Sequence, residues 1–301
     1  MIDRACISIN NKCNLRCSYC HFLSKKRADT QSKTEFNSGE VENILDNITK
    51  YCTESDIGEF KLGIVGAGEP LLSFDVLEFI VIHAKRNRNP VFRMYTISNG
   101  VALTMDHLRF FKEHSDIITL NFSLDGYEEL HDAYRQGFAK TSRAILLYEK
   151  VFGSKPTINC TVTKQSVIHE KELVRFFKDN RFERVNFSRI SDVADHDLAL
   201  SENEYCDFLR KCEAAGIKMR QRNESTKQKY DCKKYGYLCG AGKTNVFFAR
   251  NGVYPCGRFY GLEGYKVAEF DAKLDVIEER ISVFDNEAGE ECFYDRVTNQ
   301  D

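Results

Sequence analysis

The sequence predicts an α/β fold in which six strand–helix units form a parallel sheet that closes partly into a barrel. Two observations lead to this class. Over the first 215 residues, short β-rich apolar runs alternate with segments whose apolar residues recur at helical spacing. There are six such pairs, and strands that alternate with helices favour parallel pairing through right-handed crossovers. The 301 residues leave room for a second, smaller unit at the C-terminus.

The predicted elements follow one another in a regular order. The strands are expected at 5–9, 61–65, 93–98, 117–124, 157–163 and 184–190. The helices are expected at 41–52, 75–87, 104–114, 141–152, 169–180 and from 201 onward. Val41, Ile44 and Leu45, for example, show the i, i+3, i+4 spacing of one helix face. Ser201 and Glu204 form a capping box that predicts where the last of these helices begins.

Beyond the sixth unit the composition changes. We expect residues 1–215 to form the partial barrel, 216–231 a polar, basic linker, and 232–301 a small C-terminal domain. The net charge of −2 provides no basic field for nucleic acid, and no apolar run reaches the length of about 18 residues that a membrane span requires. The N-terminus lacks a signal-peptide pattern, so we expect a cytoplasmic protein without nucleic-acid or membrane partners.

Three cysteines follow the first predicted strand directly. Cys13, Cys17 and Cys20 have the spacing C-x3-C-x2-C. Three thiolates can bind three irons of a [4Fe–4S] cluster and leave the fourth iron open to a small molecule. A structural zinc site is the alternative, but it requires a fourth ligand nearby, and His21 is too constrained by the adjacent Cys20. In parallel barrels the chemistry lies at the C-terminal strand ends, where this loop begins.

This cysteine spacing after a first strand resembles the radical S-adenosylmethionine (SAM) superfamily. The resemblance implies a partial (β/α)6 TIM-like barrel with a [4Fe–4S] cluster whose open iron binds SAM. One electron, from a flavodoxin- or ferredoxin-like donor, then gives a 5′-deoxyadenosyl radical that abstracts hydrogen from the substrate. Tyr19 occupies the aromatic place before the third cysteine, which in the family lies near the adenine.

Glycine-rich and polar strand ends extend the resemblance. Gly66, Ala67, Gly68 and Glu69 follow the second strand and correspond to the Gly-Gly-Glu motif that holds the SAM amino group, with Ala67 in place of a glycine. The other SAM contacts that the resemblance implies are Ser98, Asn99, Asn121, Ser123, Asp125 and Arg135. Without the resemblance, the glycine segment would be interpreted as a tight turn, the polar residues as ordinary strand-to-loop transitions, and Arg135 as a solvated side chain.

A second group of cysteines lies near the C-terminus. Two segments, Cys239-Gly-Ala-Gly-Lys and Asn251-Gly-Val-Tyr-Pro-Cys256-Gly-Arg-Phe, resemble the start of a SPASM or twitch extension, which carries auxiliary iron–sulfur clusters. Cys232, Cys239, Cys256 and Cys292 would fully ligate one auxiliary [4Fe–4S] cluster in a small twitch-type iron–sulfur domain. A zinc ribbon is the alternative. In sulfatase-maturing relatives an Asp follows a cluster cysteine and acts as base; Gly257 stands here, so we expect another activity.

Together these features predict a radical SAM enzyme that crosslinks, epimerises or oxidises a peptide or protein, as in the maturation of ribosomally made peptides. A small-molecule dehydrogenase or epimerase, for example of aminoglycosides, is the first alternative, and a non-catalytic iron–sulfur or zinc module is the second. Because the chain starts almost directly with strand one, we expect recognition by the barrel itself or by a separate peptide-recognition protein. Cys160 is a candidate hydrogen-atom donor if it faces the barrel interior; packing in the core is the alternative.

Overall fold

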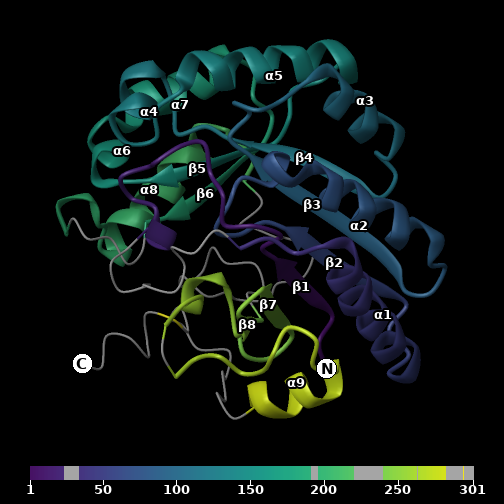
Figure 1. Cartoon of the computed structure of the whole chain (residues 1–301). Coiled ribbons are helices and arrows are strands. Elements are labelled where there is room, and N and C mark those ends of the chain that lie inside the picture. Colours follow the sequence, from purple (N-terminus) through teal and green to yellow (C-terminus); the bar gives the residue numbers. More distant parts are fainter. Residues whose placement is uncertain (24–33, 191–195, 220–239, 263, 283–293, 295–301) are drawn as a thin grey trace.

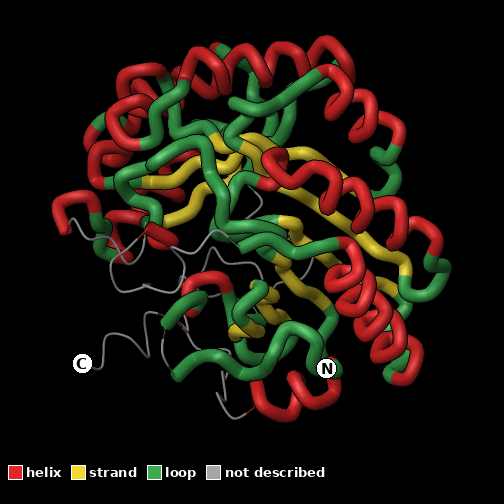
Figure 2. Tube along the Cα trace, viewed as in Figure 1, coloured by secondary structure: helices red, strands yellow, loops and turns green. Residues whose placement is uncertain are grey.

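The computed structural model describes residues 1–23, 34–190, 196–219, 240–262, 264–282 and 294. Within these residues one eight-stranded sheet has the order β6-β5-β4-β3-β2-β1-β7-β8. Neighbouring strands are parallel except β7 and β8, which are antiparallel. The sheet does not close, and the helices surround its outer face (Figure 2). The predicted open α/β barrel is confirmed.

The six predicted strand–helix units are all present. The strands are β1 (Arg4–Ile7), β2 (Glu59–Ile64), β3 (Val91–Ser98), β4 (Ile118–Ser123), β5 (Ile158–Val162) and β6 (Val185–Arg189). The helices that follow them are α1 (Ser38–Glu54), α2 (Phe74–Arg86), α3 (Met105–Glu113), α5 (Phe138–Phe152), α7 (Glu170–Asp179) and α8 (Glu202–Ala214). The capping box of Ser201 and Glu204 begins α8 as predicted. Two short helices, α4 (Glu128–Tyr134) and α6 (Lys164–Ile168), were not predicted.

The strands bury an apolar face against the helices and turn a more polar face to the barrel interior. On the outer face, Phe122 of β4 packs edge-on against Tyr148 of α5, with ring centroids 5.7 Å apart. Phe187 of β6 packs in the same way on Phe208 of α8, at 5.1 Å. Alternate residues of a strand point to opposite faces, so Asn121 and Ser123, which flank Phe122 in β4, face the interior. The polar strand ends therefore line the barrel.

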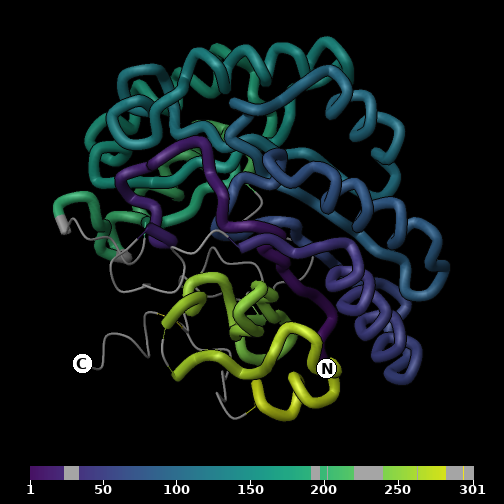
Figure 3. Tube along the Cα trace, in the orientation of Figure 1, coloured from purple at the N-terminus to yellow at the C-terminus, as the bar shows by residue number. Residues whose placement is uncertain are grey.

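The C-terminal part extends the same sheet beyond β1. Strand β7 (Asn245–Ala249) pairs in parallel with β1, and β8 (Gly252–Tyr254) pairs with β7. Helix α9 (Leu274–Ser282) lies beside the N-terminus, where Glu278 accepts a hydrogen bond of 2.7 Å from Tyr51 of α1 (Figures 1 and 3). Most of the expected linker lies outside the described residues, so the domain boundaries stay a prediction.

Candidate active site

The three N-terminal cysteines lie on a loop that leaves β1 and crosses the C-terminal ends of the other strands. The amide of Cys20 donates to the Cys17 carbonyl at 3.0 Å, which closes a tight turn. The amide of Ser18 donates to the carbonyl of Tyr134, at the end of α4, at 2.8 Å. In Figure 3 this purple segment reaches the teal part of the chain that holds α4. The loop therefore joins β1 to the far side of the barrel.

The three thiols lie close enough to influence one another electrostatically. Burial raises the pKa of Cys17 to about 11, and the neighbouring Cys20 and Cys13 raise it as well, whereas Arg135 lowers it. Burial also raises the pKa of Cys13, with a contribution from Cys20, so the three thiols lie close enough to repel as thiolates. Iron displaces such thiol protons on binding.

The spread of these cysteines is also compatible with a cluster. A [4Fe–4S] cluster binds its cysteines to different irons, so their sulfurs need not converge on one point. Among the described residues, no three His, Cys, Asp or Glu side chains surround a single metal ion. The three-cysteine loop therefore fits a cluster with an open iron.

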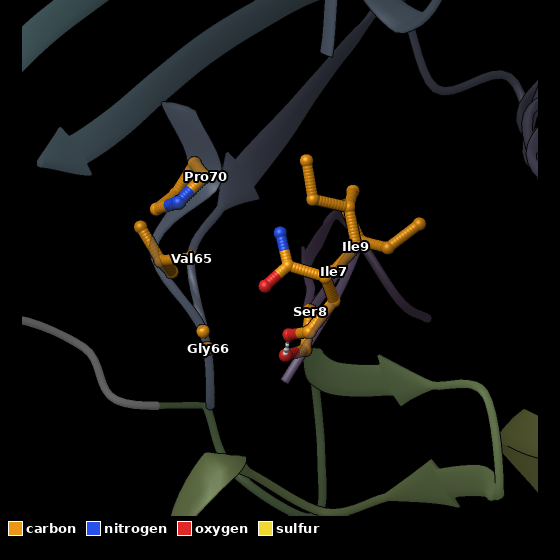
Figure 4. Close-up of a pocket in the computed structure, with 8 residues that line it drawn as sticks. Ile7, Ser8, Ile9, Val65, Gly66 and Pro70 are labelled. Atoms are coloured by element: carbon orange, nitrogen blue, oxygen red, sulfur yellow. Dashed lines mark hydrogen bonds between the residues drawn. The ribbon is translucent and has the colours of Figure 1, made fainter. Parts of the chain in front are cut away.

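The turn from Gly66 to Glu69 is packed against the end of β1. A side chain at Gly66 would overlap Ser8, and one at Gly68 would overlap Asn10, so both glycines are required for close approach. Figure 4 shows Ser8 facing Gly66 across this contact. Ser8 Oγ accepts from the Ala67 amide at 2.9 Å, and Asn10 Nδ2 donates to the Glu69 carbonyl at 3.2 Å. These bonds fix the glycine turn to the start of the cysteine loop.

Glu69 turns inward and holds the end of β3. Its carboxylate accepts from Ser98 Oγ at 2.7 Å and from the Asn99 amide at 2.8 Å. Burial raises the pKa of Glu69, while these hydrogen bonds act in the opposite direction. Asn99 in turn donates from its Nδ2 to Asn14 Oδ1 at 2.7 Å, beside Cys13. The second and third strand ends are therefore coupled through Glu69 to the cysteine loop.

Asp125, Arg135 and Tyr19 form a buried polar group next to Cys17. Arg135 Nε donates to Asp125 Oδ2 at 2.9 Å, and the Tyr19 hydroxyl donates to the same oxygen. The other carboxylate oxygen of Asp125 accepts from the Thr161 amide at 2.8 Å. The Arg135 guanidinium carbon lies 5.5 Å from the centroid of the Tyr19 ring. Arg135, whose side chain is 12% exposed, is thus held in an ion pair rather than solvated.

The remaining predicted interior residues, Asn121 and Ser123, lie on β4. Asn121 and Ser123 are 8% and 9% exposed on the barrel face of β4. Ser123 is paired in register with Asn159 of β5. These side chains, with the buried polar group, give one wall of the barrel a polar lining.

Cys160 lies on the other face of β5. It is 1% exposed and belongs to the apolar core, and burial raises its pKa well above the usual value. Cys160 is in register with Phe187, which packs on the helices, whereas Thr161 accepts a 3.4 Å hydrogen bond from Arg135 inside the barrel. This arrangement contradicts an interior orientation of Cys160 and corresponds to the core alternative, because neighbouring residues of a strand point to opposite faces.

The structure also identifies contacts that the sequence did not reveal. Ser8 and Asn10, which anchor the glycine turn, and Thr161, which holds Asp125, were not predicted as site residues. Thr141 of α5 donates its hydroxyl to the Asn99 carbonyl at 2.7 Å. The alternation of polar residues at the end of the first strand was the only sequence signal for Ser8 and Asn10.

A cluster of aromatic side chains connects Cys256 to the cysteine loop. We call this the aromatic cluster: Phe22, Phe247, Tyr254, Phe259 and Tyr260. Phe22 follows the cysteine loop, and its ring centroid is 5.9 Å from that of Tyr260. Ala67 and Cys256 pack against this cluster. The other three predicted auxiliary ligands, Cys232, Cys239 and Cys292, lie outside the described residues.

An open parallel barrel with a three-cysteine loop across its strand ends defines an iron–sulfur enzyme of the α/β-barrel class. The chain belongs to the radical SAM superfamily, whose family model matches residues 7–177. It is therefore a radical SAM enzyme, and its cofactors are a [4Fe–4S] cluster and SAM. The predicted family and cofactor pair are confirmed.

Two curated proteins are similar to this chain over much of its length. The cysteine-type anaerobic sulfatase-maturating enzyme of Clostridium novyi (strain NT) is 27% identical over 292 residues, which cover 88% of this chain and 75% of that protein. The enzyme of the same name from Clostridium perfringens (strain 13 / Type A) is 24% identical over 66% of this chain and 55% of its own length. The chain thus spans three quarters of one relative and about half of the other.

Solved structures show the same fold. Native anSMEcpe with bound AdoMet aligns with a TM-score of 0.74 at 19% identity, over 97% of this chain and 87% of that chain. Streptococcus suis SuiB bound to the precursor peptide SuiA aligns with a TM-score of 0.67 at 19% identity, over 92% and 64%. In the described part of the chain, no helix is both long and apolar enough to span a membrane.

Proposed function

We propose that this radical SAM enzyme abstracts a hydrogen atom from a peptide or protein substrate and thereby crosslinks, epimerises or oxidises it. The main support is the alignment with the sulfatase-maturating enzyme of Clostridium novyi, which covers 88% of this chain. This share is larger than the first 215 residues, so the alignment includes part of the C-terminal region as well as the barrel. Two structural neighbours with the same fold hold peptides: anSMEcpe with the Cp18Cys peptide and SuiB with SuiA.

The site residues receive the following roles in this proposal. Cys13, Cys17 and Cys20 ligate the catalytic cluster. The residues that would hold SAM beside this loop are Tyr19, Gly66, Ala67, Gly68, Glu69, Ser98, Asn99, Asn121, Ser123, Asp125 and Arg135. When bound, the cluster and SAM supply a 5′-deoxyadenosyl radical for hydrogen abstraction. The protein's own contribution is to orient SAM between the polar wall and the cysteine loop and to exclude water from that space.

A single auxiliary [4Fe–4S] cluster completes the proposal. Its ligands are Cys232, Cys239, Cys256 and Cys292. The position of Cys256 supports this, because Cys256 packs on the aromatic cluster, whose member Phe22 directly follows the catalytic loop. Four thiolates saturate such a cluster, so its role is structural or electron transfer rather than binding SAM.

Residue 257 argues for a reaction other than the sulfatase type. A carboxylate base after the cluster cysteine is not available, because the chain has Gly257 there. A Cβ atom at this position would lie 3.1 Å from the Phe247 ring, a tight contact that the ring could relieve only by shifting. We therefore propose hydrogen abstraction without a base at residue 257.

The first experiment is anaerobic reconstitution followed by reduction in the presence of SAM. We expect about eight irons per chain, from two clusters, and formation of 5′-deoxyadenosine. The Cys256→Ala variant should retain about four irons and still cleave SAM. A chain that cleaves no SAM, or that behaves identically after Cys17→Ala, would remove the catalytic assignment.

The substrate class needs a separate assay. Short peptides encoded beside the gene should lose about 2 Da on crosslinking or oxidation, whereas epimerisation should place one solvent deuterium at a single carbon. Conversion of an aminoglycoside, with no change in any peptide, would refute the peptide assignment. We further propose a flavodoxin- or ferredoxin-like electron donor, a separate peptide-recognition protein and a cytoplasmic location.

A further inference from the structure

Asn99 is held in one orientation at the end of β3. It is 5% exposed. Its amide donates to Glu69, and its carbonyl accepts from the Thr141 hydroxyl at 2.7 Å. The side-chain oxygen accepts from the Val101 amide at 2.9 Å, which determines which end of the carboxamide is nitrogen. The Nδ2 group is therefore directed away from the turn and toward the cysteine loop.

The Nδ2 group has two hydrogens and two acceptors within reach. One acceptor is Asn14 Oδ1, at 2.7 Å. The other is Cys13 Sγ, at 3.9 Å, which lies within the longer range of hydrogen bonds to sulfur. Because the side-chain NH2 group of Asn99 has two hydrogens, it can donate one to each acceptor at the same time.

We infer that Asn99 is a positioning residue that donates a hydrogen bond to the Cys13 thiolate and raises the reduction potential of the catalytic cluster. Hydrogen bonds to cluster sulfurs favour the reduced, more negative state. Asn99 also donates its backbone amide to Glu69. The glycine turn, which ends at Glu69, is therefore connected through Asn99 to the Cys13 thiolate. The inference rests on the proposed role of Cys13 as an iron ligand.

The test is an EPR-monitored redox titration of anaerobically reconstituted protein, with and without SAM. SAM changes the spectrum of the cluster that has the open iron, which separates its signal from that of the auxiliary cluster. The test variant is Asn99→Ser, because a serine hydroxyl can still accept from the Val101 amide but is too short to reach Cys13. The matched control is Thr141→Val, which removes an anchor of the same turn without approaching Cys13.

At a fixed potential, Asn99→Ser should lower the ratio of reduced to oxidised catalytic cluster about threefold to tenfold. A tenfold change corresponds to about 59 mV for a one-electron couple. Thr141→Val should leave the ratio unchanged. An unchanged ratio in Asn99→Ser, or an equal shift in Thr141→Val, would overturn the inference while leaving the cluster assignment intact.

A second measurement leaves Asn99 itself unchanged. The Asn14→Ala variant labelled with ¹⁵N-asparagine, in which Asn99 is unchanged, should show a ¹⁵N hyperfine coupling to the reduced catalytic cluster, and the absence of this coupling would overturn Asn99 as donor. A wild-type protein without any SAM-responsive signal would instead disprove the ligand role of Cys13, and the inference with it.

Discussion

Replacing Gly68 by alanine should damage the site although it removes no functional group. A methyl group at residue 68 would overlap the Oδ1 and Cγ atoms of Asn10. Asn10 is 4% exposed, and its Nδ2 donates to the Glu69 carbonyl at 3.2 Å and to Ser73 Oγ at 2.7 Å. Its Oδ1 accepts from the Lys12 amide at 2.9 Å. The added methyl therefore displaces the residue that joins the glycine turn to the cysteine loop.

The magnitude follows from these contacts. Each buried hydrogen bond contributes about 0.5–1.5 kcal/mol, and overpacking a tight contact costs about 1–3 kcal/mol. Partial loss of three bonds, or the strain of keeping them, should lower the free energy of unfolding by about 2–4 kcal/mol. Urea denaturation of the iron-free protein, followed by circular dichroism, measures this change. Iron loading of the variant should also fall, because Lys12 precedes Cys13, the proposed iron ligand.

Gly58 provides the matched control. It lies directly before β2, and a methyl group there would meet no atom within 4 Å. Gly58→Ala should therefore change the free energy of unfolding by no more than about 0.5 kcal/mol. If Gly68→Ala were as stable as Gly58→Ala and loaded iron normally, the close packing of the glycine turn on Asn10 would not be a constraint on the site, and the reasoning would be refuted.

Three further predictions concern charge and burial. Arg135→Ala leaves Asp125, whose side chain is 5% exposed, without its cation, so urea denaturation should show a loss of about 3–5 kcal/mol; a loss below 1 would contradict a buried pair. Cys160→Ala should cost about 1 kcal/mol and leave deuterium incorporation into product unchanged, and a block in incorporation would restore the donor role. The hydrogen bond from Lys12 lowers the pKa of Glu35 from its usual value of 4.5. The ionised Glu35 therefore stabilises the fold above pH 4.5, and this contribution is lost as the pH falls through the lowered pKa of the folded state. Glu35→Gln should therefore flatten the acid side of the stability profile by up to about 1 kcal/mol, since the pair is partly exposed; an unchanged profile would exclude this pair as a source of stability.

The sequence by itself determined the repeating architecture. Apolar residues at i, i+3 and i+4 and short β-rich runs are local patterns, and they placed all six strands and the helices that follow them. The cysteine spacing is also local, since three cysteines within eight residues must share one loop. For the same reason the capping box at Ser201 was correctly identified.

Only the tertiary structure decided which side chains meet. The face of Cys160 depends on strand register, and the pairing of Cys160 with Phe187 turned it toward the helices. The pairing of β7 with β1, and the contact of Asn10 with the glycine turn, join segments more than fifty residues apart. A periodic pattern predicts that a residue is buried, but it does not identify the residues that it packs against. Those neighbours depend on register and strand order, which are set by packing of the whole sheet. Glu69 was thus recognisable from the sequence as part of a motif, whereas its role in holding the end of β3 required the fold.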